Sequence, residues 1–169
     1  MLITPWVEWW TRLIGRIGAL LALPLVAAMV YEIVARQIFN APTFWAFEVA
    51  YMMMGTIFMF GIAYALKENA HVSVDLIYHQ LSPRWRGFVF LLGSVLLIPV
   101  VLWVTVGLSE YFWKAFEGDE RTGQSAWNPV IWPFRLVYFI GFATFFLQIL
   151  AECEKAIYAI RFNKTYEAD

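Results

Sequence analysis

The chain has little charge, one cysteine and two histidines, and each shortage excludes a class of protein. Charged residues make up 15% of its 169 residues, whereas hydrophobic residues make up 62%. A water-soluble domain of this length needs a larger charged share to cover its surface, so the composition indicates a membrane protein. A formal net charge of -1 provides no basic field for nucleic acid, which excludes a nucleic-acid partner.

The number and position of the cysteine, histidine and acidic residues exclude several kinds of membrane protein. Cys153 cannot form an internal disulfide and lacks the paired spacing of redox or zinc sites, which excludes a disulfide oxidoreductase. A membrane cytochrome b needs histidine pairs at bilayer depth, but His71 and His79 fall in a polar stretch between apolar runs. A proton-coupled exporter needs an acidic residue at mid-membrane, and the acidic residues near the runs lie at their ends. The sequence predicts no enzyme activity, no cofactor, and no catalytic, metal or substrate-binding site in this chain.

What the chain does have is long uncharged runs, interrupted by short polar segments. About 20 apolar residues cross the roughly 30 Å hydrocarbon layer as a helix, and four segments are long enough. Pro24 and Pro99 lie inside two of them, where membrane helices accommodate proline by kinking. We therefore predict an all-α membrane protein, a single domain over 1–169 with four transmembrane helices. The expected spans are about 13–35, 44–66, 87–112 and 132–152, with a cytoplasmic loop at 67–86 and a periplasmic loop at 113–131.

The first run has the alternative interpretation of a secretory signal peptide, because Arg12 and Arg16 precede it. Glu32 and Arg36 follow it, however, where a small-residue cleavage site is expected. The tryptophans near the N-terminus are typical of an interfacial anchor. We interpret this run as a retained helix.

Lysine and arginine are divided unequally between the two sides of the predicted spans. Cytoplasmic loops of membrane proteins carry the excess of these residues, so both termini are predicted to be cytoplasmic. Eight residues lie on the terminal side, and they are Arg12, Arg16, Lys67, Arg84, Arg86, Lys155, Arg161 and Lys164. Four lie on the other side, and they are Arg36, Lys114, Arg121 and Arg135.

Charges cluster around the first outward turn. Glu32 and Arg36 are four residues apart in the favourable acid-before-base order, so they are expected to pair on one helix face. Asn40 and Pro42 predict a turn, and hence an antiparallel hairpin of spans one and two that brings Arg36 near Glu48. The cluster either only neutralises charge and fixes the hairpin at the membrane edge, which we favour, or docks a neighbouring subunit.

The polar stretch after the second span predicts a short helix over about 70–81. His71, Asp75 and His79 recur every four residues and would form one polar ridge. The two histidines are two turns apart and too few for a closed zinc site, so a solvated or subunit-facing ridge is favoured.

Several motifs, taken in order, give the chain a family resemblance. They are Arg36, Phe39, Asn40, Pro42, Trp45 and Glu48 at fixed spacing, a second span with glycines at Gly55 and Gly61, "HVSVD" at 71–75 and "SAWNPVIWPFR" at 125–135. The combination resembles the small membrane subunit of tripartite ATP-independent periplasmic (TRAP) transporters, the DctQ-like family. The resemblance covers about residues 36–148.

The resemblance implies a partnership in the bacterial inner membrane. TRAP systems combine this small multi-pass subunit with a large multi-span membrane subunit and a periplasmic substrate-binding protein, and they import organic acids such as carboxylates or sulfonates. The large subunit uses the sodium gradient and moves like an elevator, while the small subunit braces its immobile scaffold in contact with membrane lipid. The alternative is an autonomous homo-oligomeric transporter or channel, with Glu32, Arg36 and Glu48 lining a path.

Two groups of residues become candidates for contact with partners. The structural or subunit-interface candidates are Glu32, Arg36, Asn40, Pro42, Trp45, Glu48, His71, Asp75, Trp127, Asn128 and Arg135. The candidates for docking the binding protein are Lys114, Glu117, Asp119, Glu120 and Arg121, although mixed charges on a loop are more often plain solvated surface.

Overall fold

The structure is a computed structural model, and it describes residues 3–68 and 81–164. His71, Asp75 and His79, with the helix predicted around them, lie outside the described residues. Five helices make up nearly all of the described chain. They are α1 (Thr4–Leu20), α2 (Ala22–Gln37), α3 (Ala46–Lys67), α5 (Pro83–Glu117) and α6 (Trp132–Phe162).

Four helical segments are long and apolar enough to cross a membrane, which confirms the predicted all-α class with four candidate spans. Helices α1 and α2 together supply the first segment, Thr4–Gln37. At about 1.5 Å per residue, the segments formed by α5, by α6 and by α1 with α2 are longer than the hydrocarbon layer is thick. The ends of these helices therefore extend beyond it, and the membrane boundaries within them stay predictions.

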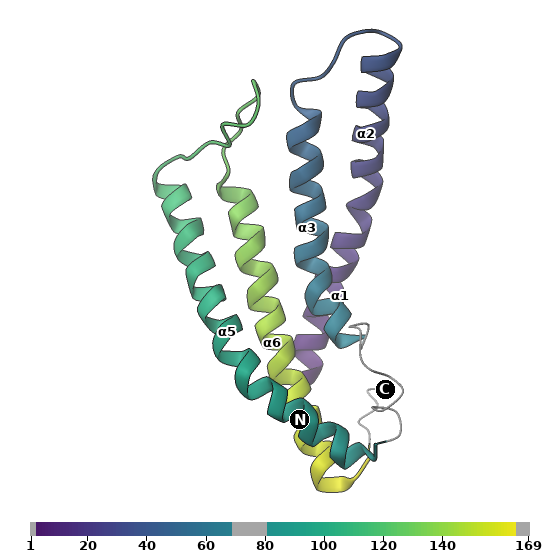
Figure 1. The fold of residues 1–169 in the computed structure, drawn as a ribbon, viewed down its shortest axis with the longest axis vertical. Helices are drawn as coiled ribbons and strands as arrows, with labels where there is room; N and C mark the ends of the chain where they lie inside the picture. Colours follow the sequence, from purple (N-terminus) through teal and green to yellow (C-terminus); the bar gives the residue numbers. More distant parts are fainter. Residues whose placement is uncertain (1–2, 69–80, 165–169) are drawn as a thin grey trace.

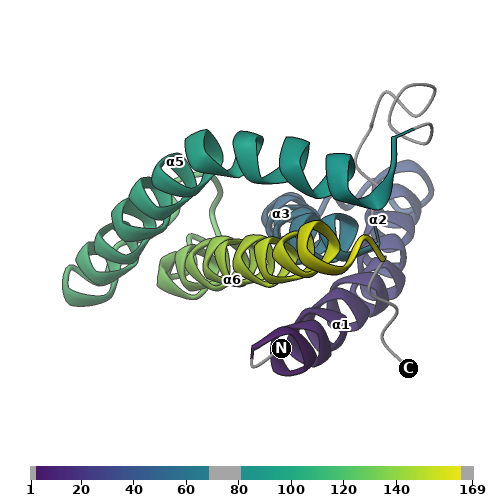
Figure 2. The same ribbon diagram turned by 90° about the horizontal axis from the view of Figure 1, so that it is seen from below.

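Prolines and helix caps explain where the helices bend and end. The first segment is interrupted at Leu21, within the turn before Pro24, which has no N–H to donate to the carbonyl four residues back. Helix α5 continues through Pro99 and changes direction along its length (Figure 2). Helix α6 ends at Asn163, whose left-handed conformation (φ 51°) is a common way to stop a helix.

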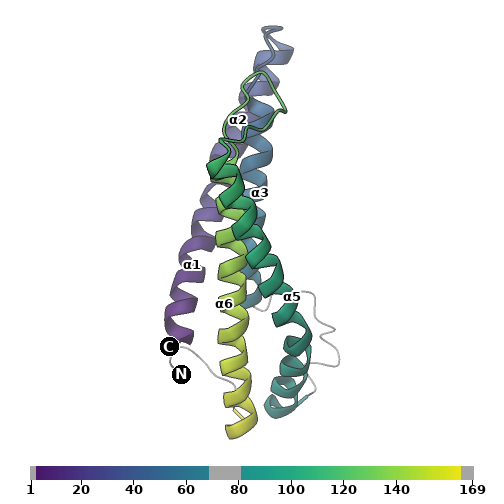
Figure 3. The ribbon, with the colours of Figure 1, turned by 90° about the vertical axis from the view of Figure 1, so that its left-hand side faces the viewer.

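The helices form two pairs that diverge toward one end of the molecule (Figure 1). Helices α2 and α3 form one antiparallel pair and α5 and α6 the other, with α6 also packed against α1 and α3. The connections 38–45 and 118–131 both lie at the diverging end, which we call the hairpin end. The start of α1 and the end of α6 lie at the opposite end, as Figure 3 also shows, and we call it the terminal end.

The core is small and lies where α3, α5 and α6 meet. Its buried members are Ala63, Val101, Phe145 and Ile149. Close packing also occurs at Gly55, where an added Cβ would approach the Phe134 ring to 2.8 Å. Gly55 is therefore a packing residue. Gly61 is not one among the described residues, because a Cβ there would meet nothing within 4 Å.

Candidate functional site

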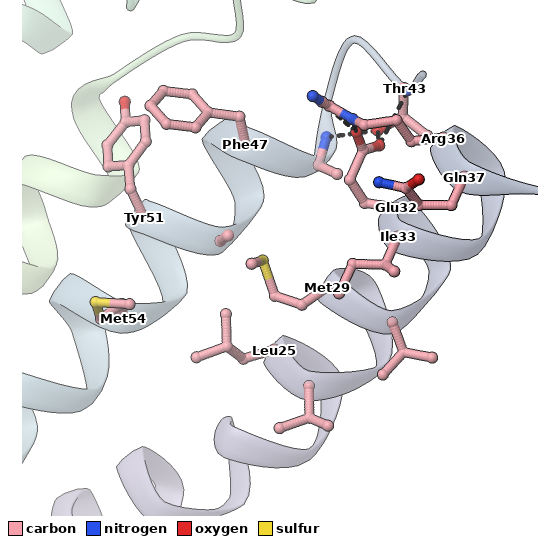
Figure 4. A pocket seen from close by; sticks show the side chains of 14 residues that line it. Leu25, Met29, Glu32, Ile33, Arg36, Gln37, Thr43, Phe47, Tyr51 and Met54 are labelled. Carbon is pink, nitrogen blue, oxygen red and sulfur yellow. Dashed lines mark hydrogen bonds and ion pairs between the residues drawn. The ribbon is translucent and has the colours of Figure 1, made fainter. Parts of the chain in front are cut away.

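The first cluster at the hairpin end joins α2 to the connection that follows it. Arg36 donates from Nε and Nη2 to Oε1 of Glu32, at 2.8 and 2.5 Å. Thr43 donates its backbone N–H to Oε2 of Glu32 at 3.0 Å, and its hydroxyl donates to the same oxygen (Figure 4). The predicted Glu32–Arg36 pair is confirmed, and Thr43 is a partner that the spacing alone did not reveal.

The residues of the turn between α2 and α3 are held by contacts with nearby parts of the chain. Asn40 takes a left-handed conformation (φ 49°), and the next N–H, that of Ala41, donates back to the carbonyl of Ala35 at 3.0 Å. Pro42 is exposed, while Trp45 stacks on Tyr31 of α2 with 5.8 Å between ring centroids. These contacts fix the angle at which α3 leaves the turn.

Glu48 lies apart from this cluster. It is fully buried in the first turn of α3, and the hydroxyl of Thr122 donates to its Oε1 at 2.8 Å. Within residues 3–68 and 81–164, no hydrogen bond or ion pair joins Glu48 to Arg36. The hairpin does not bring the two together, because they face different neighbours: Arg36 faces its own turn, and Glu48 faces the 118–131 connection. Its other oxygen, Oε2, is buried without a hydrogen-bond partner.

The 118–131 connection is an ordered β-like turn rather than a loose loop. Arg121 and Val130 form an isolated antiparallel bridge, and Thr122 donates its backbone N–H to the carbonyl of Pro129 at 3.1 Å. Asn128 closes the tip, because its side-chain oxygen accepts from the N–H of Gly123 at 2.8 Å. We call this segment, residues 118–131, the outer turn.

Arg135 secures the outer turn to the helices. Its guanidinium lies 3.6 Å from the ring centroid of Tyr111 on α5, and its Nη2 pairs with Glu120 at 2.6 Å. Only 11% of the Arg135 side chain is exposed. This arginine is therefore a structural clamp between α5, α6 and the outer turn, which agrees with its place among the structural candidates.

The remaining docking candidates are exposed on the outer turn or beside it. Lys114 and Glu117 were expected in the loop, but they lie in the last turns of α5, since that helix continues to its end at Glu117. Asp119 and Arg121 form a loose ion pair at 3.6 Å. Trp127 is 42% exposed on the same turn. The surface thus offers mixed charges and one aromatic ring to the space outside the helices.

A polar network that the sequence reasoning missed joins α1 to α6. Thr11 donates to Oε1 of Gln148 at 2.8 Å, and Nε2 of Gln148 donates to Oε1 of Glu152 at 2.8 Å. Lys155 bridges Glu152 and Glu8 at 2.7 and 2.6 Å. Thr11 and Gln148 are fully buried.

Three further hydrogen bonds extend the contact of α1 with α6 along both helices. Thr4 donates from its backbone N–H and its hydroxyl to Glu154, at 3.2 and 2.6 Å. The indole N–H of Trp10 donates to the hydroxyl of Thr144 at 3.1 Å. We call these contacts between α1 and α6 the polar seam.

A sequence signal for the polar seam existed. Thr4, Glu8 and Thr11 are spaced four and three residues apart, which places them on one helix face. The tryptophans of α1 lie largely on other faces, and Trp6 and Trp9 are 78% and 57% exposed. Helix α1 thus buries a polar stripe against α6 and turns its tryptophans outward together with Arg12 and Arg16. Polar groups buried between helices are the arrangement expected in lipid rather than in water.

At the terminal end, one exposed acidic group has a shifted pKa. The hydrogen bond from Lys67, at 2.6 Å, holds the pKa of the Glu68 carboxyl below its usual range. Burial acts weakly in the opposite direction. Glu68 is therefore charged at neutral pH and caps the end of α3 as half of a surface ion pair.

Chemically, the arrangement can hold helices together and present surface, and it offers little else. In the part of the chain that the structure describes, no three His, Cys, Asp or Glu residues are placed to hold a metal ion. Few residues in the most apolar part of each candidate span are buried inside the molecule: 6% for Thr4–Gln37 and 28% for Trp132–Phe162. On α5, Leu96 and Trp103 are 78% and 77% exposed. Such faces need lipid or another apolar protein against them.

Comparison with known proteins gives one family. Residues 25–157 match the family model described as "Tripartite ATP-independent periplasmic transporters, DctQ component". The chain is 24% identical over 110 residues to "Sialic acid TRAP transporter permease protein SiaT" of Haemophilus influenzae, covering 64% of this chain and 18% of that protein. It is 26% identical over 100 residues to "Sialic acid TRAP transporter small permease protein SiaQ" of Vibrio cholerae, covering 57% of this chain and 55% of that protein. No solved structure matches the chain.

Proposed function

The chain belongs to the DctQ family of TRAP transporter components, and on that premise we propose that it is the static brace of such a transporter. As a family member it is a small permease component rather than an enzyme. The proposed partner is a large multi-span membrane subunit that carries the substrate site and slides through the bilayer. An elevator motion needs one part held still, and helices packed on the static part resist its tilting.

The observation that carries this proposal is how the buried polar groups are used. Gln148, Thr11 and Thr144 lie deep between helices, and each is bonded to another side chain of the polar seam. Among the described residues, only Glu48 Oε2 and Arg135 Nε are buried side-chain atoms without a hydrogen bond. Polar groups that bond each other hold α1 against α6 and are not free to bind a solute. The exposed apolar faces supply contact area for a partner.

The alternative of an autonomous transporter or channel draws no support from these contacts. It requires Glu32, Arg36 and Glu48 to line one path. Glu32 and Arg36 bond each other at the turn, whereas Glu48 is buried against the outer turn. No observation on the described residues favours a path between them.

The orientation and the transported solute also belong to the proposal. The excess of lysine and arginine on the terminal side supports cytoplasmic termini in the bacterial inner membrane. The hairpin end, with the outer turn, would then face the periplasm. The printed names of both relatives refer to sialic acid. For this chain we propose import of an organic acid, driven by sodium through the large subunit.

We further propose that the outer turn contributes to docking the periplasmic substrate-binding protein. Arg135 clamps the turn to the helices and Asn128 closes its tip, so its exposed groups are held in a fixed arrangement. A preorganised surface loses less entropy on binding than a mobile one. Its mixed charges would act mainly on the rate of encounter.

Reconstitution tests the scaffold role. The chain is co-expressed with the large subunit, purified in mild detergent and reconstituted with the binding protein, and the chain alone is treated in parallel. We expect a stoichiometric complex that takes up the organic acid with a sodium gradient, and no uptake by the chain alone. Uptake at the same rate by vesicles that hold only this chain would contradict the proposal.

Charge variants test the docking role. Glu117→Gln and Asp119→Asn are expected to lower uptake severalfold at low salt and limiting binding protein, because surface steering weakens. Glu110→Gln removes the same charge from α5 at a position further from the outer turn and serves as the control. Complex yield should be unchanged in all three. If the two test variants match the control at every salt concentration, the outer turn is not part of the docking surface.

A further inference from the structure

An apolar groove lies between α2 and α3, and its lining residues belong to these two helices and to the turn between them (Figure 4). Its volume is about 750 Å³, and nonpolar side chains from both helices line it. Leu25, Met29 and Ile33 line it from α2, and Phe47, Tyr51 and Met54 line it from α3. Methionine is flexible and polarisable, so a groove with two of them adapts to a flexible occupant.

One end of this groove is polar, and it carries spare hydrogen-bond donors. Both oxygens of Glu32 already accept bonds, from Arg36 and Thr43. Arg36 uses Nε and Nη2 for Glu32, while its Nη1 has no hydrogen-bond partner within residues 3–68 and 81–164, and the Arg36 side chain is 61% exposed. Gln37 lies beside it at the same end with an exposed side chain. This end therefore suits a ligand with an anionic, oxygen-rich group.

The length of the groove fits half a bilayer. From Leu25 to Arg36 a helix rises about 17 Å, and one leaflet contributes about 15 Å of the hydrocarbon layer. With Arg36 at the membrane surface on the hairpin side, the groove runs through that leaflet and ends near the midplane. An acyl chain anchored at the surface has this direction and this reach.

We propose that the groove binds a phospholipid of the leaflet on the hairpin side. One acyl chain lies between Met29 and Met54, and the phosphate accepts hydrogen bonds from Nη1 of Arg36 and the amide of Gln37. Arginine is well suited to phosphate, because its planar guanidinium presents several donors at once. A partner helix in the groove is less compatible, since it would cover the Arg36 guanidinium and leave its spare donors unpaired. The proposal does not depend on the transporter partnership or on the orientation.

Photo-crosslinking of lipid tests the proposal. The full chain, with whatever subunit purifies with it, is placed in nanodiscs that contain phosphatidylethanolamine with a diazirine at mid-chain. After irradiation, labelled peptides are identified by mass spectrometry. We expect labelling of the Met29 and Met54 peptides to exceed that of the exposed Leu96 and Trp103 face of α5. Equal labelling of both faces would mean ordinary surrounding lipid and would overturn the proposal.

Variants separate the headgroup contact from the chain contact. Arg36→Gln should lower groove labelling about fivefold, as expected for losing a charge-assisted bond at a partly exposed site, and Arg121→Gln should not lower it. A long-chain alcohol with the same diazirine, which has no phosphate, should label equally in both variants. If Arg36→Gln leaves lipid labelling unchanged, or lowers labelling by the alcohol equally, the phosphate contact is refuted.

A second variant covers the case in which Arg36→Gln disturbs the turn. Val26→Trp fills the groove from a position that is 60% exposed, and it keeps the Glu32–Arg36 pair. It should remove labelling of the Met54 peptide while leaving labelling of α5 unchanged. Unchanged Met54 labelling would overturn the proposal. Crosslinks from the groove to protein, with none to lipid, would do the same and would identify a partner helix as the occupant.

Discussion

The bond between Thr11 and Gln148 offers the sharpest test of how this protein is held together. Gln148→Leu replaces the amide with an apolar side chain of similar size and removes two bonds, one from Thr11 and one to Glu152. Side-chain hydrogen bonds between membrane helices are worth about 0.6 kcal/mol on average and up to about 1.7 kcal/mol. The Thr11 bond crosses between helices and the Glu152 bond lies within α6, and losing both should destabilise the fold by about 1 to 2 kcal/mol. The remaining partner of Glu152, Lys155, limits the loss.

Thr11→Val completes the pair as a shape-conserving change that removes only the hydroxyl. Alone it should cost about 0.6 kcal/mol or somewhat more, because Gln148 then retains a buried carbonyl without its donor. Each single variant loses the shared Thr11–Gln148 bond, and the double variant Thr11→Val with Gln148→Leu also loses it only once. The losses of unfolding free energy in the two single variants should therefore add up to about 0.6 kcal/mol more than the loss in the double variant.

The measurement is reversible unfolding in mixed micelles with increasing dodecyl sulfate, followed by circular dichroism and confirmed by thermal unfolding of the complex. Thr56→Val is the control, because the Thr56 hydroxyl donates at 2.8 Å to the carbonyl of Met52 in its own helix. It should cost less than Thr11→Val. If the Thr11 and Gln148 changes are additive within about 0.3 kcal/mol, or if Gln148→Leu is as stable as the wild type, the polar seam does not hold α1 to α6.

Three further predictions concern the hairpin end and the packing of α3. Arg36→Ala should lower thermal stability slightly, since the Arg36 side chain is exposed and Thr43 still donates to the Glu32 carboxylate. Unchanged thermal stability and complex yield would refute a structural role for the pair. Gly55→Ala should lower the melting temperature, because the added Cβ would contact the Phe134 ring. Gly61→Ala is the control and should leave the melting temperature unchanged. Equal melting temperatures for the two variants would contradict close packing at Gly55. Arg135→Gln should release the outer turn from α5 and α6. A protease added on the side of the hairpin end should then cleave the outer turn faster. Unchanged cleavage would mean that other contacts hold the turn.

The sequence was informative where one helix or one turn decides the outcome. The Glu32–Arg36 pair needs only a spacing of four on one helix, and the turn at Asn40 and Pro42 needs only local conformational preferences. The four apolar segments follow from length and hydropathy alone. These features depend on neighbours in the chain, so they are visible without a structure.

The sequence was not informative where two distant segments decide the outcome. Glu48 was expected near Arg36 because a tight hairpin brings their positions together, but burial of Glu48 beside Thr122 depends on where the outer turn packs. The polar seam joins residues at opposite ends of the chain, and no local spacing specifies which face of α6 meets α1. The pattern of Thr4, Glu8 and Thr11 shows that a polar face exists, and only the fold shows what covers it.

The distribution of these contacts bears on what the protein does. The polar seam runs toward the terminal end, where bonds from Thr4, Glu8 and Thr11 tie about two turns of α1 to α6. At the hairpin end, the described part of the chain has one side-chain bond between α3 and the outer turn, from Thr122 to Glu48. Opening a solute pathway between α1 and α6 would break several buried bonds at once, each worth about 0.6 kcal/mol in a membrane. Nothing in lipid replaces those bonds, because hydrocarbon offers no donors or acceptors. A seam of this kind therefore favours one fixed arrangement of α1 and α6, which is what the proposed brace requires.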